Sequence, residues 1–96
     1  MQSCIDACKD CIKVNKNKDS CYKACMDCIN ICSFVLKTKF HCKENESNLL
    51  KLCITCCKIC ISECENHAKH SRVCKRCVEE CSKCIQEIYL KHSKLL

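Results

Sequence analysis

Four nine-residue segments of the chain repeat one pattern of apolar and polar positions. They are CIDACKDCI at 4–12, CYKACMDCI at 21–29, CITCCKICI at 53–61 and CVEECSKCI at 77–85. Cysteine occupies the first, fifth and eighth places of every segment, and these places fall at roughly 0°, 40° and −20° around an α-helix. The three cysteines of each segment therefore share one narrow stripe, and the pattern predicts four amphipathic helices.

A ridge of larger apolar side chains accompanies the cysteine stripe. The second and ninth places of the segments hold Ile, Tyr or Val and lie at roughly 100° and 80°, beside the cysteines. The ridge consists of Ile5, Ile12, Tyr22, Ile29, Ile54, Ile61, Val78 and Ile85. The remaining places are mostly polar or charged, as on a solvent-facing surface. We expect the ridge to pack against neighbouring helices, so that the protein folds without metal.

The chain contains no Gly and no Pro, so clusters of polar residues must mark its turns. Such clusters occur at residues 15–19 (NKNKD), 43–48 (KENESN) and 66–71 (NHAKHS). We expect helices at about 2–14, 20–42, 48–67 and 72–94. The N-caps expected from residue type are Asp19 or Ser20, Asn45 or Ser47, and Ser71.

Four amphipathic helices joined by short polar turns pack as an antiparallel, up-down four-helix bundle with each cysteine stripe turned inward. The predicted fold class is all-α, and a chain of 96 residues is expected to form one domain, residues 1–96. The cysteines expected in the interior are Cys4, Cys8, Cys11, Cys21, Cys25, Cys28, Cys32, Cys53, Cys56, Cys57, Cys60, Cys64, Cys74, Cys77, Cys81 and Cys84. Cys42 returns to the stripe only if the second helix extends that far.

Apolar residues outside the repeats predict that the two ends of the bundle differ. Antiparallel packing brings together Val35, Leu36, Phe40, Leu49, Leu50, Ile88 and Leu95. We expect an apolar plug at that end, and metal access at the other end, near the first polar turn. His67 continues the stripe beyond the last cysteine of its helix and is a candidate ligand at this opening, whereas His70 is expected to be solvated. His41 and His92 are expected on the surface.

The composition requires the cysteines to be part of the interior. Leu, Ile, Val and Phe supply only 22 of the 96 residues, whereas 17 are Cys, and this apolar content is low for an ordinary globular core. Such a chain is either a disulfide framework of a secreted protein or a thiolate metal site in a reducing compartment. The start MQSCIDACKD lacks the features of a secretory signal, and no apolar run reaches membrane-spanning length. We therefore expect a cytoplasmic protein with free thiols.

Three uses of these thiols compete: packing alone, disulfides and metal binding. Free Cys packs as a small hydrophobe, but Ala or Val would fill the same space without the risk of oxidation. Within a helix the Cβ atoms of residues i and i+4 lie roughly 5 to 6 Å apart, whereas a disulfide needs roughly 3.5 to 4.5 Å. An odd number of cysteines also prevents complete internal pairing. A bundle stapled by disulfides between helices stays as an alternative.

Pairs with the spacing CxxxC suit a bridging metal ion, because their sulfurs lie on adjacent helical turns. They are Cys4 with Cys8, Cys21 with Cys25, Cys28 with Cys32, Cys53 with Cys57, Cys56 with Cys60, Cys60 with Cys64, and Cys77 with Cys81. Thiolates select Cu(I), Zn(II) or iron–sulfur clusters. The sequence has no iron–sulfur motif, and zinc motifs normally place CxxC in turns rather than within helices.

Charge favours Cu(I) among these ions. Replacing a thiol proton by Cu(I) leaves the charge of the interior unchanged, whereas an isolated four-thiolate zinc site carries a charge of about −2, which is costly to bury. No Lys or Arg lies on the cysteine stripe of any repeat to offset that charge. We therefore expect several Cu(I) ions per chain, with a metallothionein-like buffer of Zn(II) or other soft divalent ions as the alternative.

Repeated CxxxC pairs on the inward faces of four helices resemble the cysteine-lined copper storage proteins of bacteria. The resemblance extends over essentially the whole chain. It implies a four-helix bundle whose thiolates hold many Cu(I) ions, and a homo-oligomer. The family has cytosolic and exported branches, and the absence of a secretory signal leads us to expect the cytosolic branch. The first helix departs from the pattern because it is short and has three cysteines, which leaves one corner of the interior either open or filled by a neighbouring subunit. Cys42, His67 and His70 are further candidate ligands.

The net charge of +6 does not indicate nucleic-acid binding, because Lys and Arg alternate with acidic residues and the chain has only two Tyr and two Phe to stack on bases. The positive surface suits docking of a copper donor or acceptor protein, or of a small-molecule copper ligand. No carboxylate pair, P-loop or Ser-His-Asp set is recognisable. The expected function is storage or sequestration of Cu(I), without catalysis and without a nucleic-acid or membrane partner.

Overall fold

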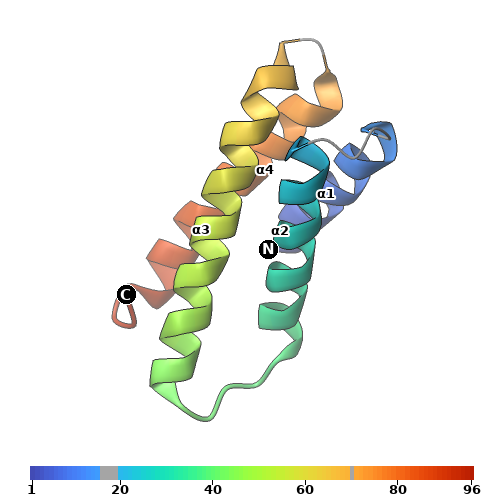
Figure 1. Ribbon diagram of the computed structural model, residues 1–96. Coiled ribbons are helices and arrows are strands. Elements are labelled where there is room, and N and C mark those ends of the chain that lie inside the picture. The colour runs from blue at the N-terminus through green and yellow to red at the C-terminus, as the bar shows by residue number, and fades with distance from the viewer. Residues whose placement is uncertain (16–19, 70) are drawn as a thin grey trace.

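The computed structural model describes residues 1–15, 20–69 and 71–96 and is built from four α-helices (Figure 1). They are α1 (Gln2–Val14), α2 (Ser20–Lys37), α3 (Lys43–Ala68) and α4 (Arg72–His92). The helices lie side by side in an elongated molecule with dimensions of 41 × 20 × 17 Å. No strand occurs in the described part of the chain, and the predicted all-α fold class is confirmed. None of the described helices combines the length and the apolar character needed to cross a membrane.

Each helix packs against two neighbours: α1 against α2 and α4, and α3 against α2 and α4. Consecutive helices run in opposite directions, as their facing cysteines demonstrate. In α2 and α3, Cys21 at the start of one helix faces Cys64 near the end of the other, while Cys32 faces Cys53. In Figure 1, the connection between α2 and α3 lies at the bottom of the view, so that α3 returns beside α2. The chain therefore forms the up-down bundle predicted from the four repeats.

The boundary between α2 and α3 differs from the prediction. α2 ends at Lys37 rather than near residue 42, and α3 begins at Lys43 rather than near residue 48. The polar segment 43–48, interpreted as a linker from its composition, is the first part of α3. Glu44 and Glu46 lie in its first turn, where negative charges are favoured by the positive end of the helix dipole. The bounds of α1 agree with the prediction, and α4 ends two residues early, at His92.

The N-caps were predicted with mixed success. Ser71 caps α4 as expected, since its Oγ accepts a hydrogen bond from the Cys74 amide at 3.3 Å. The prediction for α3 was wrong: Cys42 is its N-cap, and Ser47 lies within the helix, where its hydroxyl donates to the Leu95 carbonyl. Ser20 is the first residue of α2, and Asp19 lies outside the described residues.

Cysteines make up most of the interior. Fifteen of them are buried, and the other buried residues in the described part of the chain are Ile5, Ala7, Ala24, Leu50, Ile54 and Ile88. The remaining Ile and Val residues of the predicted ridge are partly buried and pack against this core. Fully burying an aliphatic side chain contributes roughly 1.5–3 kcal/mol. The ridge therefore supplies packing energy that does not depend on metal.

The end of the bundle beyond the cysteines is apolar, as predicted, although its seal is incomplete. Leu50 and Ile88 are each only 1% exposed, and Val35 and Leu95 are partly buried against the core. Leu36, by contrast, lies in the last turn of α2 and is 49% exposed. The plug consists chiefly of side chains from α3 and α4.

Candidate metal centre

The buried cysteines form four layers along the bundle. The first layer contains Cys11, Cys21, Cys64 and Cys74; the second Cys8, Cys25, Cys60 and Cys77; the third Cys4, Cys28, Cys57 and Cys81; and the fourth Cys32, Cys53 and Cys84. Successive layers are separated by three or four residues on each helix, or roughly 5 Å of helix rise. Each of the first three layers takes one cysteine from every helix.

This register follows from cysteine spacing that alternates between three and four residues. An average of 3.5 residues keeps a side chain on the same face of a helix in a bundle, turn after turn. The spacing is 4-3-4 in both α2 and α3 and 3-4-3 in α4. When these helices run antiparallel, the cysteines of one come opposite those of the next. A stripe along each helix thus becomes a stack of thiol rings.

Sulfur atoms within a layer are close to one another. In the first layer, the Sγ atoms of Cys21 and Cys64 lie 2.8 Å apart, and Cys11 Sγ lies 3.7 Å from the sulfurs of Cys21 and Cys74. In the second layer, Cys60 Sγ lies 3.5 Å from Cys25 Sγ and 3.6 Å from Cys77 Sγ. These thiols share hydrogen bonds across helices, and all seventeen cysteines are free.

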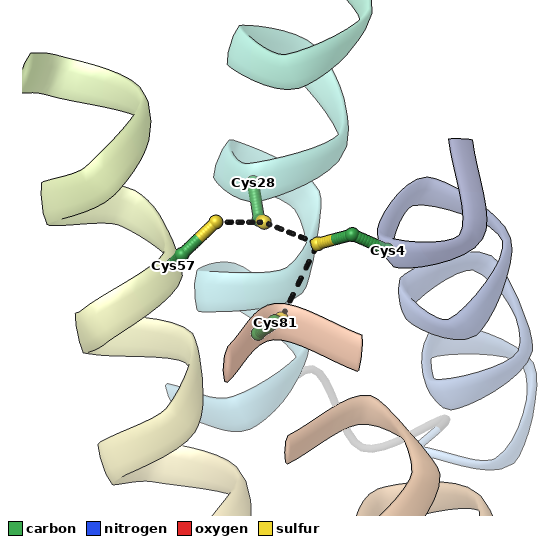
Figure 2. A group of neighbouring side chains, drawn as sticks. All are labelled: Cys4, Cys28, Cys57 and Cys81. Atoms are coloured by element: carbon green, nitrogen blue, oxygen red, sulfur yellow. Dashed lines mark hydrogen bonds between the residues drawn. The ribbon is translucent and has the colours of Figure 1, made fainter. Parts of the chain in front are cut away.

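Figure 2 shows the third layer, in which Cys4, Cys28, Cys57 and Cys81 point toward one another from the four helices. Cys4 Sγ lies 3.7 Å from Cys28 Sγ and 3.4 Å from Cys81 Sγ, and Cys28 Sγ lies 3.8 Å from Cys57 Sγ. All four sulfurs lie within 4.8 Å of one another, so that this group could hold a metal ion. The layer has the donor type and the compactness of a thiolate metal site.

Five such four-thiol groups occur in the described residues. One lies within a single layer, the third, and the other four span adjacent layers, for example Cys25, Cys60, Cys64 and Cys77. Contacts between layers link the groups, as between Cys8 and Cys81 at 3.9 Å and between Cys25 and Cys64 at 3.7 Å. Because several cysteines belong to more than one group, the interior is a continuous array of ligands rather than a set of separate sites.

Of the sixteen cysteines predicted for the interior, Cys56 is the exception. It is half-buried and belongs to none of the five thiol groups. The other cysteines of its helix centre on one face, and Cys56 lies roughly 70° from that centre by helical geometry. Burial raises the pKa of its thiol to about 11. Cys42 also lies away from the layers, exposed at the start of α3, because α2 ends too early to carry it.

Proton sharing controls the charge of the array. Burial raises the pKa of Cys21 to about 12 and also raises that of Cys74, since a thiolate loses hydration in the interior. A hydrogen bond from Cys32 lowers the pKa of Cys28 to about 6, because a donating neighbour stabilises the thiolate. No charged side chain is buried among the described residues. A thiolate in this interior is therefore stabilised by neighbouring thiols, or by a bound cation.

Asn15 closes the first layer at the end opposite the apolar plug. Its Nδ2 group donates to the Cys11 sulfur at 3.2 Å, to Cys21 at 3.6 Å and to Cys74 at 3.8 Å. The sequence interpretation treated Asn15 as part of a polar turn. The signal that could have identified it is its position four residues after Cys11, which continues the stripe of α1.

The three histidines in the described part of the chain, at positions 41, 67 and 92, belong to none of the thiol groups. His67 is half-buried in the last turn of α3, one turn beyond Cys64, and its role as a ligand stays a prediction. His70 lies outside the described residues. His41 is exposed as expected, whereas His92 is half-buried and lines a cavity at the apolar end.

Comparison with known proteins agrees with this site. The family model for copper storage proteins matches residues 1–90, a range that includes all four layers. No curated protein and no solved structure matches the chain. Because the family match extends over nearly the whole of the 96 residues, the chain belongs to the copper storage protein family.

Proposed function

We propose that this protein stores or sequesters Cu(I), with several ions per chain bound by the thiolates of the four layers. The observation that carries the proposal is an interior of fifteen buried cysteines in which the described residues place no buried charged side chain. Membership of the copper storage family supports copper as the ion. The ions are the cargo of the protein, and no reaction beyond their binding and release is required.

The distances support multiple occupancy. Metal–sulfur bonds are roughly 2.3 Å long, so one ion can touch two or more sulfurs that lie 3.5–4 Å apart. Sulfur pairs at such distances occur within layers, as between Cys25 and Cys60 at 3.5 Å, and between layers, as between Cys28 and Cys32 at 3.9 Å. Ions can therefore be held side by side along the array with little movement of the helices.

Charge supports Cu(I) over Zn(II). Each Cu(I) that binds replaces one thiol proton, which leaves as H⁺, so the interior remains neutral as it fills. Each isolated four-thiolate zinc site would carry a charge of about −2, and every uncompensated charge in an interior costs several kcal/mol. The Lys and Arg side chains in the described ion pairs are exposed, for example Arg76, which pairs with Asp10 at 2.8 Å. No charged side chain is buried among the described residues to compensate such a charge.

We place metal access at the first layer, near Asn15, because the opposite end is occupied by Leu50 and Ile88. A negatively charged copper donor or acceptor protein, or a small-molecule copper ligand, would be attracted by the net charge of +6. We also propose that the protein is cytoplasmic, in keeping with its free thiols.

A homo-oligomer is part of the proposal. Large apolar side chains are exposed where α2 and α4 end, with Phe34 53%, Leu36 49% and Leu90 84% exposed. Apolar groups gathered at one end of a molecule commonly mark an interface. Light scattering after gel filtration tests this point, and a monomer at all concentrations would contradict it.

One anaerobic experiment tests the storage proposal. Free thiols are counted in reduced protein, Cu(I) and Zn(II) are then titrated separately against competing chelators, and the bound ions are counted by mass spectrometry. We expect many Cu(I) ions per chain, retained against the competitor. Saturation at one or two Cu(I) ions would contradict storage. Tight and preferential Zn(II) binding would instead support a metallothionein-like buffer, and few free thiols would support a disulfide-stapled bundle.

A further inference from the structure

The fourth layer has no cysteine from α1, and Met1 occupies the missing position. α1 carries cysteines at 4, 8 and 11, and a residue at position 1 extends this spacing to 3-4-3, the spacing found in α4. In the antiparallel pair α1 and α4, Cys4 lies beside Cys81 and Cys8 beside Cys77. The same register brings position 1 beside Cys84, the α4 member of the fourth layer.

The side chain of Met1 is held at this position. It is only 9% exposed, and it packs against the buried core. Met1 lines one pocket together with Cys4 and Cys84 and another together with Leu50 and Ile88. Met1 therefore lies between the fourth cysteine layer and the apolar plug.

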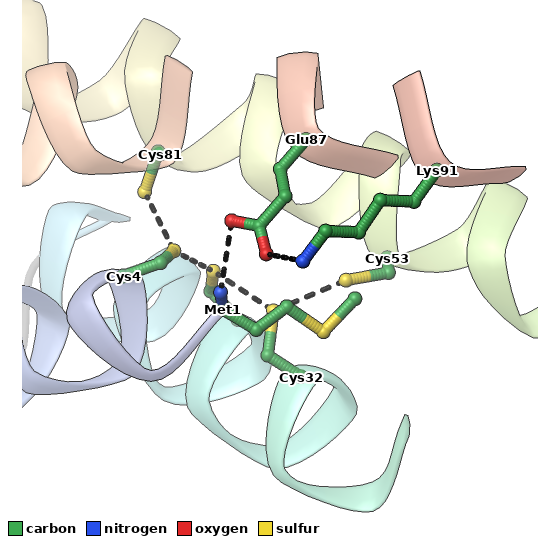
Figure 3. A network of polar contacts seen from close by, with 8 residues as sticks. Met1, Cys4, Cys32, Cys53, Cys81, Glu87 and Lys91 are labelled. Carbon is green, nitrogen blue, oxygen red and sulfur yellow. Dashed lines mark hydrogen bonds and ion pairs between the residues drawn. The ribbon is translucent and has the colours of Figure 1, made fainter. Parts of the chain in front are cut away.

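Figure 3 shows how the residue is oriented. In this view the Met1 side chain overlaps the contact between Cys32 and Cys53, whose sulfurs lie 3.1 Å apart. The amino group of Met1 turns the other way and pairs with Glu87 at 3.4 Å, while Lys91 holds the second carboxylate oxygen of Glu87 at 2.9 Å. The ion pair anchors the Met1 backbone on α4, while the Met1 side chain packs against the buried core.

The thioether has the chemistry that the fourth layer needs if the layer is selective for copper. Thioether sulfur is a soft ligand that binds Cu(I), whereas zinc sites in proteins use Cys, His and carboxylates. A thioether is neutral and has no proton to lose, so it adds a ligand to the layer without adding charge. At the same position Leu would fill the space but would offer no ligand.

We propose that Met1 completes the fourth layer, with its thioether joining the thiolates of Cys32, Cys53 and Cys84 as a ligand for Cu(I) at the closed end of the array. This inference rests on the proposed function, because it requires Cu(I) to reach the interior. It adds a mixed thioether–thiolate site in the fourth layer, which differs from the all-thiolate first, second and third layers. The competing explanation is that Met1 serves only as an apolar packing residue.

The chain contains only two methionines, and the second provides an internal control. Met26 lies on α2 and is half-buried, but it is not on the cysteine face. In protein labelled with ¹³C at the methionine methyl groups, both signals can be followed by NMR during anaerobic addition of Cu(I), which is diamagnetic. We expect the Met1 methyl signal to shift as the array fills and the Met26 signal to change much less. Zn(II) should not reproduce the Met1 shift.

Variants give the second measurement. Met1→Leu can be produced from a fusion whose cleavage leaves Leu at the first position, which preserves the amino group that pairs with Glu87; Met26→Leu is the matched control. We expect Met1→Leu to retain about one Cu(I) ion fewer than the parent protein at a chelator concentration that the parent resists, because one ligand set is incomplete. Met26→Leu should retain the parent number. Circular dichroism of the apo proteins establishes that both variants fold.

The outcomes separate this inference from the storage proposal. If the parent protein binds many Cu(I) ions, while Met1→Leu retains the same number and the Met1 methyl signal moves no more than that of Met26, Met1 is a packing residue and only this inference fails. If the parent protein binds one or two ions, the storage proposal fails and this inference fails with it. A Met1 shift that Zn(II) also produces would assign it to a change of packing and overturn the thioether ligand.

Discussion

The layered arrangement predicts that two cysteines on the same helix, one turn apart, differ sharply in their contribution to copper binding. Cys60 is fully buried, and its sulfur contacts those of Cys8, Cys25, Cys64 and Cys77 at 3.5 to 3.9 Å. It belongs to two of the five thiol groups, whereas Cys56 belongs to none. The perturbation is Cys60→Ser, and Cys56→Ser is its control with the same chemical change.

The expected magnitudes follow from this geometry. Serine is close to cysteine in size, so no large cavity forms, but a hydroxyl in an apolar site loses roughly 1–3 kcal/mol relative to water unless it is fully hydrogen-bonded. The apo form of Cys60→Ser should therefore be destabilised by up to this amount. Cys56→Ser, at a half-buried site, should change the free energy of unfolding by less than about 0.5 kcal/mol.

Cys60→Ser should also reduce copper capacity more than Cys56→Ser does. If the array fills toward one Cu(I) per thiolate, Cys60→Ser should lose about one ion and should also weaken the retention of ions by its four neighbours. A ligand present at 100 times its Kd stabilises the folded state by about 2.7 kcal/mol, so the loss should also reduce the thermal stabilisation produced by copper. Cys56→Ser should retain the parent values for both.

The assay combines anaerobic Cu(I) titration against a competing chelator with thermal unfolding of the apo and loaded forms. The reasoning would be refuted if the two variants lost the same number of ions, because the thiol groups would then not define the binding array. It would also be refuted if Cys60→Ser bound as much copper, as tightly, as the parent protein.

Three further predictions follow from the ridge, the buried thiols and the opening of the array. Apo protein should be folded and helical by circular dichroism, and a random-coil apo spectrum would contradict this account. Ile54→Ala should lower the free energy of unfolding by about 2–5 kcal/mol. Ile59→Ala, at a site that is 50% exposed, should have little effect. Burial raises the pKa of the Cys21 thiol from 9.0 to about 12. The protonated thiol therefore contributes fully to apo stability below pH 9, and this contribution is lost as the pH rises toward 12. Denaturant titrations across this range should show the free energy of unfolding falling, and a rise would contradict the prediction. Burial raises the pKa of Cys74, and the hydrogen bond that Asn15 donates to its sulfur acts in the opposite direction. Asn15→Ala should therefore slow Cu(I) uptake at neutral pH in stopped-flow measurements, with the final capacity unchanged. Equal uptake rates would contradict a role for Asn15 at the opening.

The agreement between sequence and structure is closest where one helix decides the outcome by itself. The cysteines at 4, 8 and 11 share a face because the helical repeat is a local property of the backbone, and all three are buried as predicted. Ser71 caps its helix because a serine hydroxyl reaches a nearby amide in the same turn. These features need no information about the rest of the molecule.

The errors occur where several local signals compete. The acidic residues Glu44 and Glu46 are equally compatible with a polar linker and with the first turn of a helix, and the structure places them in α3. Cys56 lies at the margin of the cysteine stripe, where a small rotation of α3 decides between the interior and the surface. Helix rotation and helix ends depend on packing between helices, which a single repeat does not encode.

The sequence by itself determined that this chain forms four amphipathic helices, each with a face of cysteines and a neighbouring apolar ridge, because the spacing of three and four residues matches the period of one helix. Only the tertiary structure decided which cysteines of different helices meet in one layer, that Asn15 closes the first layer, and that Met1 lies at the fourth. The physical reason is range: a helix repeats over a few residues, whereas a layer is made by residues as distant as Cys4 and Cys81, which meet only when four helices pack together.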